Sequence, residues 1–263
     1  DGQTVGSALT QSDKVHGVCF TGSTPTAMRI NQNMASHMSP SAPLIAETGG
    51  INVGIVDSTA LPEQAIRDAL ASAFQSAGQR CSALRVLYVQ DDVADILLEM
   101  LFGAMDELEL GDPWELSTDI GPVINEAARF SIQEYIDTAK TEGRLLKALA
   151  IPTKGLFVAP TVIEVSGIEA IEKEVFGPVL HIARFKAADF EKVIEQVNAA
   201  GYGLTFGLHT RIDERVKYVA TAVHAGNIYV NRNQIGAIVE SQPFGGEGLS
   251  GTGPKAGGPR YVQ

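Results

Sequence analysis

The chain has little of several features that mark common functional classes. It contains two cysteines among 263 residues, too few for a disulfide framework. The net charge is −11 and no run of Lys or Arg is present, so a surface for nucleic acid or an anionic membrane is not expected. No stretch approaches the roughly 20 apolar residues of a membrane span, and the first residues lack the basic and apolar regions of a signal peptide.

The histidines do not form a metal site or a protease pair. They are scattered at positions 16, 37, 181, 209 and 224, without metal-ligand spacing and without a Cys/His pairing. No metal is therefore expected. The hydrophobic fraction of 44% and the charged fraction of 19% are those of a globular chain, long enough for one large or two ordinary domains.

Strand and helix patterns alternate along the chain. Apolar runs predict strands at 15–21, 44–47, 52–56, 84–89, 157–165, 179–185, 204–209 and 227–230. Helical periodicity predicts helices at 27–37, 62–77, 93–108, 125–141, 188–199 and 213–222. This order predicts an α/β fold with a parallel sheet covered on both faces.

Two short stretches carry the strongest chemical pattern, A-E-T-G-G at 46–50 and A-G-Q-R-C-S-A at 77–83. A lone cysteine is more often a small buried hydrophobe, and Cys19, in an apolar strand, is expected to be one. Cys81 has polar neighbours instead, and Arg80 is expected to favour its thiolate. A thiolate attacks a carbonyl, and a nearby carboxylate such as Glu47 can activate the water that releases the acyl group.

Three further stretches are ambiguous by themselves. The segment F-T-G-S-T-P-T-A at 20–27 can be an ordinary helix start or a phosphate site, and with one Gly it is not a dinucleotide fingerprint. A plain turn would also explain E-V-F-G-P at 174–178. The Gly-rich segment 243–259 is either a flexible tail or a shaped loop that approaches a ligand closely.

Together these motifs resemble the aldehyde dehydrogenase superfamily. The family's cofactor-phosphate turn is matched by F-T-G-S-T, its E-L-G-G by A-E-T-G-G, and its nucleophile motif G-Q-x-C by G-Q-R-C. Its mid-domain loop is matched by L-G-D-P…T-D-I-G-P, its nicotinamide-ribose motif by E-V-F-G-P, and its last loop by P-F-G-G…S-G. The six motifs occur in the family's order over residues 15–258.

One branch is especially similar. R-C-S-A and the last loop resemble the 1-pyrroline-5-carboxylate (L-glutamate γ-semialdehyde) dehydrogenase module of bacterial proline utilization A. The resemblance covers nearly the whole chain but only about the C-terminal half of such a module. It implies three parts: residues 1–47 as the end of a Rossmann-like NAD-binding domain, 48–242 as the catalytic domain, and 243–263 as a substrate-anchor loop leading into an oligomerisation strand.

The resemblance also implies a role for each matching residue. Cys81 would form a thiohemiacetal and then a thioester with the aldehyde, and Glu47 would activate the hydrolytic water to yield L-glutamate. The oxyanion would meet backbone N–H groups near Cys81 and an Asn side chain. The implied contacts to NAD are Gly22, Ser23, Glu174 and Phe176, and those to the substrate are Ser82, Phe244, Ser250 and Gly251.

Cofactor and partners follow from the same resemblance. NAD is the implied cofactor, with FAD confined to a proline dehydrogenase domain in the same full-length polypeptide. The implied substrate is a small amino-acid semialdehyde, and the implied setting is a cytoplasmic homo-oligomer that binds no nucleic acid. Because the chain begins inside a turn and stops at the start of a strand near Tyr261, we expect a fragment with little or no activity alone.

The chain departs from the family pattern in two ways. Ala27 stands where a second Gly is usual in the phosphate turn, which allows less close backbone approach. The family's oxyanion Asn and the residues that choose between NAD and NADP have no counterpart in the chain.

Three alternatives remain open from the sequence. The first is a dehydrogenase of another carboxylated aldehyde such as succinate semialdehyde, for which an Arg is expected in the last loop. The second is a non-catalytic module, which would be expected to lose Cys81 or Glu47. The third is a thioester or ester hydrolase, which has no use for the nucleotide motifs.

Overall fold

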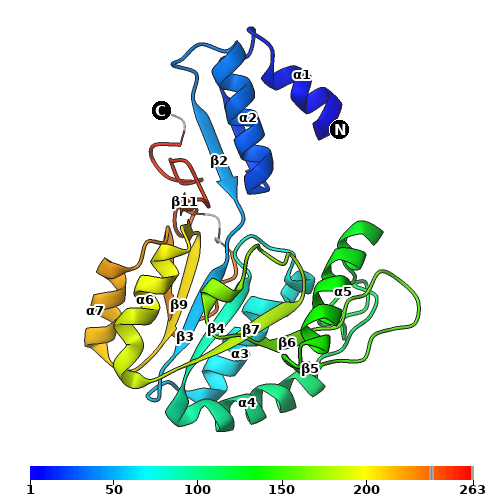
Figure 1. Ribbon diagram of the computed structural model, residues 1–263, viewed down its shortest axis with the longest axis vertical. Helices are drawn as coiled ribbons and strands as arrows, with labels where there is room; N and C mark the ends of the chain where they lie inside the picture. Colours follow the sequence, from blue (N-terminus) through cyan, green and yellow to red (C-terminus); the bar gives the residue numbers. More distant parts are fainter. Residues whose placement is uncertain (237, 239, 262–263) are drawn as a thin grey trace.

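The computed structural model describes residues 1–236, 238 and 240–261, which form a small lobe and a large lobe (Figure 1). The small lobe contains two parallel strands, β1 (Val18–Gly22) and β2 (Leu44–Thr48), joined by helix α2 (Thr24–His37). A helical turn at Gly2–Gly6 and the short helix α1 (Ser7–Thr10) precede β1. The chain therefore starts in helical structure, where the sequence had suggested a turn.

The large lobe is built on a seven-stranded sheet of order β10-β9-β3-β4-β7-β6-β5. All neighbouring pairs are parallel except β5 and β6. The strands are β3 (Asn52–Val56), β4 (Leu84–Gln90), β5 (Leu145–Ala148), β6 (Thr161–Glu164), β7 (Val179–Phe185), β9 (Thr205–His209) and β10 (Asn227–Val230). Every residue of β3, β4 and β9 is buried, as a parallel sheet with two covered faces requires.

Helices cover both faces of this sheet. They are α3 (Pro62–Phe74), α4 (Asp91–Asp106), α5 (Glu126–Thr141), α6 (Phe190–Ala199) and α7 (Asp213–Ala222). The connection from β3 to β4 runs toward one edge of the sheet, and those from β7 to β9 and from β9 to β10 run toward the other. Because such connections are right-handed, α3 lies on one face of the sheet, and α6 and α7 lie on the opposite face. The α/β fold with a largely parallel sheet is thus confirmed.

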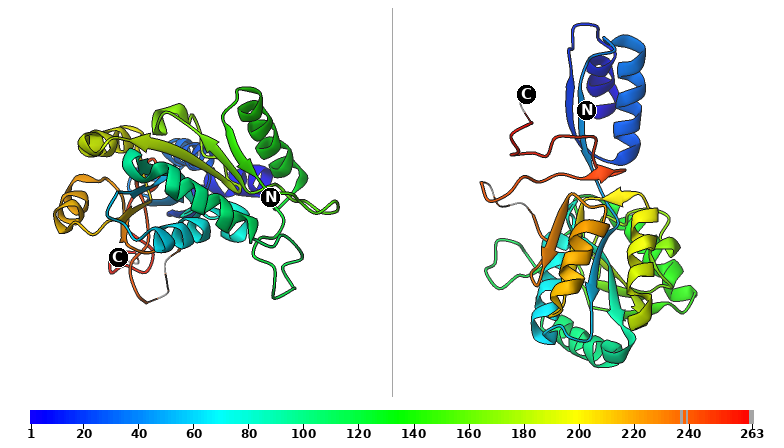
Figure 2. Two further views of the ribbon diagram at one scale, coloured as in Figure 1. Left: turned by 90° about the horizontal axis from the view of Figure 1, so that it is seen from below. Right: turned by 90° about the vertical axis from the view of Figure 1, so that its left-hand side faces the viewer.

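The two lobes meet end to end. Only residues 49–51 separate the end of β2 from the start of β3, so β2 leads directly into the large sheet (Figure 1). The last segment of the chain lies across this junction, as Figure 1 and the right-hand view of Figure 2 show. Its strand β11 (Glu247–Gly248) pairs with β8 (Tyr202–Gly203) of the large lobe, and Thr252 N–H donates to the Ala46 carbonyl of β2 at 3.0 Å. The tail is therefore a shaped loop that joins the lobes.

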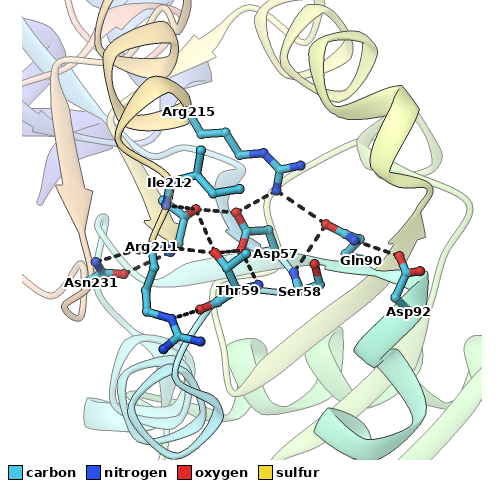
Figure 3. Close-up of polar contacts among 10 residues, drawn as sticks. Asp57, Ser58, Thr59, Gln90, Asp92, Arg211, Ile212, Arg215 and Asn231 are labelled. Atoms are coloured by element: carbon cyan, nitrogen blue, oxygen red, sulfur yellow. Dashed lines mark hydrogen bonds and ion pairs between the residues drawn. The ribbon is translucent and has the colours of Figure 1, made fainter.

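A polar network closes the opposite end of the large sheet, where the strands finish (Figure 3). Asp57, directly after β3, accepts hydrogen bonds from the backbone N–H and hydroxyl of Thr59, at 2.7 and 2.6 Å. Its other oxygen accepts from the Thr210 hydroxyl and from Arg215 Nη1, the latter at 2.6 Å. Both carboxylate oxygens of this buried side chain are therefore paired.

Several elements differ from the sequence-based expectation. The strand expected at 157–165 begins only at Thr161, directly after Pro160, which has no N–H to donate to a neighbouring strand. The strand β5 and the pair β8–β11 were not predicted, because their short segments carry no apolar alternation.

Two predictions concern particular positions. Cys19 is exposed, and no residue of β1 is buried, so the expected buried Cys19 is wrong. The reason is that β1 is an edge of a two-stranded sheet with little covering it. Tyr261 lies in a bend, and residues 262–263, where the oligomerisation strand was expected to continue, lie outside the described residues. The domain boundaries stay predictions.

Candidate active site

The candidate nucleophile, Cys81, follows a turn of unusual backbone conformation. Ser76, Ala77 and Gly78 have φ values of 55°, 53° and 66°, so three consecutive residues are left-handed. Gly78 must lack a Cβ, which would lie 2.1 Å from the Gly177 carbonyl oxygen. The turn thus packs directly against the loop 174–178 and presents a half-buried Cys81 at the amino end of β4.

The surroundings of Cys81 raise its pKa. Burial is the largest cause, the charge of Glu174 is the next, and that of Glu47 adds to them. Backbone N–H groups of Ser82 and Cys81 itself point at the sulfur and oppose these effects. The expectation that Arg80 favours the thiolate is wrong, because its Nε donates to the Ser76 hydroxyl at 3.0 Å. The carbonyl oxygen of an aldehyde becomes an oxyanion when the sulfur adds to its carbon, and these two N–H groups are available to donate hydrogen bonds to it.

Glu47 lies at the end of β2, on the small-lobe side of the junction. Its Oε2 accepts from the Gly246 N–H at 2.9 Å, while its Oε1 is buried without a partner among the described residues. Burial raises the pKa of Glu47, and the Gly246 bond and the charge of Lys255 oppose the rise. A half-desolvated carboxylate with one free oxygen is suited to accept a proton from water. Since its charge acts on Cys81, the structure brings the two predicted catalytic residues together.

Glu174 and Phe176, the predicted nicotinamide-side contacts, lie in the loop 174–178. Glu174 pairs with Arg85 at 2.9 Å and accepts from the Gly50 N–H. A Cβ on Gly49 would lie 1.8 Å from Glu174 Oε2, so the A-E-T-G-G glycines make room for this carboxylate. The Phe176 ring is 45% exposed, which leaves an open aromatic face beside Glu174.

Gly22 and Ser23, the predicted diphosphate contacts, lie where β1 ends and α2 begins. Both are exposed, and the Ser23 hydroxyl bonds that of Thr26 at 2.9 Å in the first turn of the helix. At the start of this 14-residue helix Pro25 has no N–H, and the N–H groups of Thr26 and Ala27 donate to the Ser23 carbonyl. An anion such as a diphosphate is favoured there by the positive end of the helix dipole and by the Ser23 hydroxyl. Gly22 pairs in register with Thr48, the residue after Glu47, so this segment lies on the small-lobe side of the junction.

The predicted substrate contacts are placed in two ways. The Ser82 hydroxyl is buried and accepts from the Gly236 N–H at 3.1 Å. The Ser250 hydroxyl is fully buried, accepts from Gly203 N–H at 3.1 Å and donates to the Gly49 carbonyl at 2.9 Å. Gly251 forms a bridge to Glu47, and Phe244 is half-buried and paired with Ala256.

These substrate roles stay predictions. To donate to a carboxylate, the Ser250 hydroxyl would have to release the Gly49 carbonyl, whereas the Ser82 hydroxyl can keep the bond from Gly236 and still donate its proton. Gly251 is better placed, because its backbone lies directly beside Glu47.

Two positioning residues were missed from the sequence. Asn52, at the start of β3, donates to the carbonyls of Cys81 and Ala83 at 2.6 and 2.8 Å and accepts from the Thr205 N–H at 3.1 Å. Arg85 is a fully buried charge in β4. The available signal was a polar residue inside each otherwise apolar strand, N-V-G-I-V and L-R-V-L-Y-V.

The residues present fit a dinucleotide that reaches from α2 to Cys81. The helix start offers a phosphate the positive end of its dipole and the Ser23 hydroxyl, and the carboxylate of Glu174, held in the cradle formed by Gly49 and Gly50, is suited to ribose hydroxyls. Within residues 1–236, 238 and 240–261, no group of three or more His, Cys, Asp or Glu could hold a metal ion. In the same residues, no helix has the length and apolarity to cross a membrane.

Comparison with known proteins agrees with this geometry. A family model for the aldehyde dehydrogenase family matches residues 1–263. The chain is 54% identical to bifunctional protein PutA of Escherichia coli K12, over 99% of its length and 21% of the relative's. It is 38% identical to the 1-pyrroline-5-carboxylate dehydrogenase of Geobacillus thermodenitrificans, over 99% of its length and 52% of that protein.

Solved structures show the same relationship. Proline utilization A of Bradyrhizobium japonicum superimposes with a TM-score of 0.96 at 52% identity, over all of this chain and 27% of that one. The Thermus 1-pyrroline-5-carboxylate dehydrogenase with bound NAD gives 0.87 at 33% identity, over 96% of this chain and 49% of that one. The chain thus spans about a fifth of the PutA relatives and half of the single-function ones. Matched over its whole length and carrying the nucleophile and base motifs at one junction, the chain belongs to the aldehyde dehydrogenase family.

Proposed function

We propose that the protein containing this chain oxidises L-glutamate γ-semialdehyde, the open form of 1-pyrroline-5-carboxylate, to L-glutamate with NAD. The observation that carries the proposal is the position of Cys81 and Glu47 at one junction, where Asn52, five residues after Glu47, donates to the Cys81 carbonyl at 2.6 Å. Relatives named for this activity align over 99% of the chain.

The chain's own residues supply the covalent chemistry. The Cys81 thiolate adds to the aldehyde carbon, and the N–H groups of Ser82 and Cys81 face the oxygen that becomes negative. NAD, when bound, accepts the hydride that converts this thiohemiacetal to a thioester. Glu47, through its unpartnered Oε1, then takes a proton from water, whose oxygen attacks the thioester carbon. The carboxylate product leaves and Cys81 regains its thiol.

The remaining inferences concern the whole polypeptide. We propose a proline dehydrogenase domain with FAD in the same chain, since identity to the bifunctional PutA proteins is 54% against 38% for single-function relatives. We further propose a homo-oligomer, and a cytoplasmic location because a catalytic thiol needs a reducing compartment. Flavin absorbance and proline oxidation by the natural polypeptide would test the first of these.

The decisive experiment measures NADH formation by the longest natural polypeptide that contains the chain. Substrates are glutamate semialdehyde, succinate semialdehyde and propanal, and the variants are Cys81→Ala and, as matched control, Cys19→Ala. We expect a strong preference for glutamate semialdehyde, lost in Cys81→Ala and kept in Cys19→Ala. Preference for succinate semialdehyde would overturn the substrate, and NADH from none of the three would overturn the activity.

A further inference from the structure

Arg85 is a buried cation shared between two loops of the active site. Its side chain is 1% exposed and belongs to the second residue of the apolar strand β4. Nη1 donates to the carbonyls of Gly78 and Gly177, at 2.7 and 3.2 Å. Nη2 donates to the carbonyl of Arg80 at 3.1 Å and to Glu174 Oε1 at 2.9 Å. A buried guanidinium is costly unless it is paired, and here every partner belongs to the nucleophile turn or the loop 174–178.

Glu174 extends the connection to a third segment. Its carboxylate is 17% exposed, is paired with Arg85 and also accepts from the Gly50 N–H. The Arg85 guanidinium lies 5.3 Å from the centre of the Phe176 ring. One ion pair therefore touches all three motifs of the site: A-E-T-G-G, G-Q-R-C and E-V-F-G-P.

The pair also affects the charge at Cys81. After burial, the charge of Glu174 is the largest effect that raises the pKa of Cys81, and Arg85 interacts with the same sulfur with the opposite sign. The other charged or titratable groups that act on Cys81 are Glu47 from β2 and Tyr229 from β10. Arg80, its chain neighbour, is directed to Ser76. The two members of the Arg85–Glu174 ion pair thus act on the charge of the sulfur with opposite signs.

We propose that Arg85 is a positioning residue that fixes the nucleophile turn against the loop 174–178 and neutralises Glu174 beside Cys81. The inference rests on the proposed function, in which Cys81 is the nucleophile and Glu174 a cofactor contact. A buried Arg with only a structural role would hold the loops together without influencing the proton on Cys81. The two roles therefore differ in what they predict for thiol ionisation.

The test is the pH dependence of Cys81 alkylation by iodoacetamide in the full natural polypeptide, read by mass spectrometry of the peptide that carries Cys81. The variants are Arg85→Met, Glu174→Gln and the double variant. The exposed Cys19 in the same chain is the internal reference for reagent and pH. Neither substrate nor cofactor is needed, so failure here leaves the dehydrogenase assay intact, and failure of that assay leaves this measurement interpretable.

We expect Glu174→Gln to move the alkylation midpoint to lower pH, because it removes a negative charge from beside the sulfur. Arg85→Met should move it to higher pH and slow alkylation about tenfold below the midpoint, since one pKa unit is a tenfold change in thiolate. The double variant should return toward the wild type. Arg85→Lys, which keeps the charge without the fork, should keep the midpoint but weaken NAD binding.

Other outcomes would overturn the proposal. An unchanged or higher midpoint in Glu174→Gln would leave Arg85 with a structural role only. The same would follow if Arg85→Met and Glu174→Gln shifted the midpoint in one direction. If Arg85→Met does not fold, Glu174→Gln decides alone, because it leaves the carbonyl contacts of Arg85 in place.

Discussion

Asp57 is a buried carboxylate after β3 and Glu47 a half-buried one at the end of β2, and their surroundings differ. At the carboxyl end of β3, burial would raise the pKa of Asp57, but bonds from Thr210, Thr59 and Arg215 outweigh it and lower the pKa. At the junction before β3, burial of Glu47 prevails, its pKa is raised, and Oε1 is left unpartnered among the described residues.

The comparison separates a stabilising site from a reactive one. A fully bonded carboxylate gains from its environment and adds to stability, whereas an incompletely bonded one costs stability and keeps a lone pair for chemistry. Arg85 shows the same feature, since its Nε is also buried without a partner in the part of the chain that the structure describes. Among the described residues three buried side-chain atoms lack a partner: Glu47 Oε1 and Arg85 Nε, both at the active site, and Asp68 Oδ2 in α3. None of them belongs to the Asp57 network (Figure 3).

The largest expected effect is on turnover at the junction. Glu47→Gln should lower steady-state turnover by roughly 10²- to 10⁴-fold, because the general base for thioester hydrolysis is removed. The first turnover should survive, since Cys81 is untouched. Rapid-mixing measurement of NADH should then show a burst close to one equivalent per site. Loss of the burst together with turnover would contradict the assignment of Glu47 to hydrolysis.

At the Asp57 end of the sheet we expect an effect on stability. Asp57→Ala leaves Arg215 without its ion-pair partner and should lower the free energy of unfolding by about 3 kcal/mol. This is the lower end of the range for breaking a buried ion pair, because the Arg215 side chain is 20% exposed to solvent. Amide exchange in β3 and β9 should become roughly 100-fold faster. Asp95→Ala, which breaks the exposed pair with Arg184, is the matched control and should cost under about 1 kcal/mol.

A third test uses pH, because the two carboxylates should have opposite slopes. The lowered pKa of Asp57 means that its stabilisation is present above the unfolded value near pH 4 and is lost as pH falls through the folded value. Glu47, with a raised pKa, should destabilise progressively as pH rises from the unfolded value through the folded one.

Thermal unfolding midpoints against pH would check this. The deficit of Asp57→Asn relative to the wild type should shrink below pH 4. The advantage of Glu47→Gln should grow as pH rises above the ordinary carboxyl range. Parallel curves for both variants would remove the distinction between the two ends.

The smallest effect concerns the strained turn before Cys81. Ser76 is exposed and has a left-handed backbone conformation, which is strained for any residue but Gly. Ser76→Gly should therefore raise the free energy of unfolding by about 0.5–1 kcal/mol, which is the strain relieved minus the greater conformational entropy that Gly loses on folding. Ser36→Gly, in the exposed face of α2, is the matched control and should destabilise by a similar amount. Urea unfolding of both variants would decide, and a destabilised Ser76→Gly would show that the turn is unstrained.

Much of the fold was predictable because strand and helix periods are local properties. The segments 52–56 and 213–222 were predicted with the bounds that the structure shows, each having a clear apolar pattern. The edge strand β1 was predicted, but it was expected to be buried and none of its residues is, which is why Cys19 is exposed. Burial depends on what covers a strand, which periodicity does not record.

The sequence predicted which residues belong to the site better than it predicted which charges act on them. The motifs identified Cys81, Glu47 and Glu174, but Arg80 was expected to activate Cys81 because it precedes it in the chain. In the structure, the Arg80 side chain donates to Ser76, and the cation whose charge interacts with that of Cys81 is Arg85. The Arg85 charge is tolerated in an apolar strand because Glu174, in the loop 174–178, pairs with it.

The sequence by itself determined which residues can react and which segments become strands and helices, since both depend on side-chain type and short-range spacing. The tertiary structure alone decided where the site lies, at the end-to-end junction of two sheets, and which carboxylates are paired. The physical reason is that charge pairing and desolvation act through space between segments far apart in the chain, such as Arg85 and Glu174.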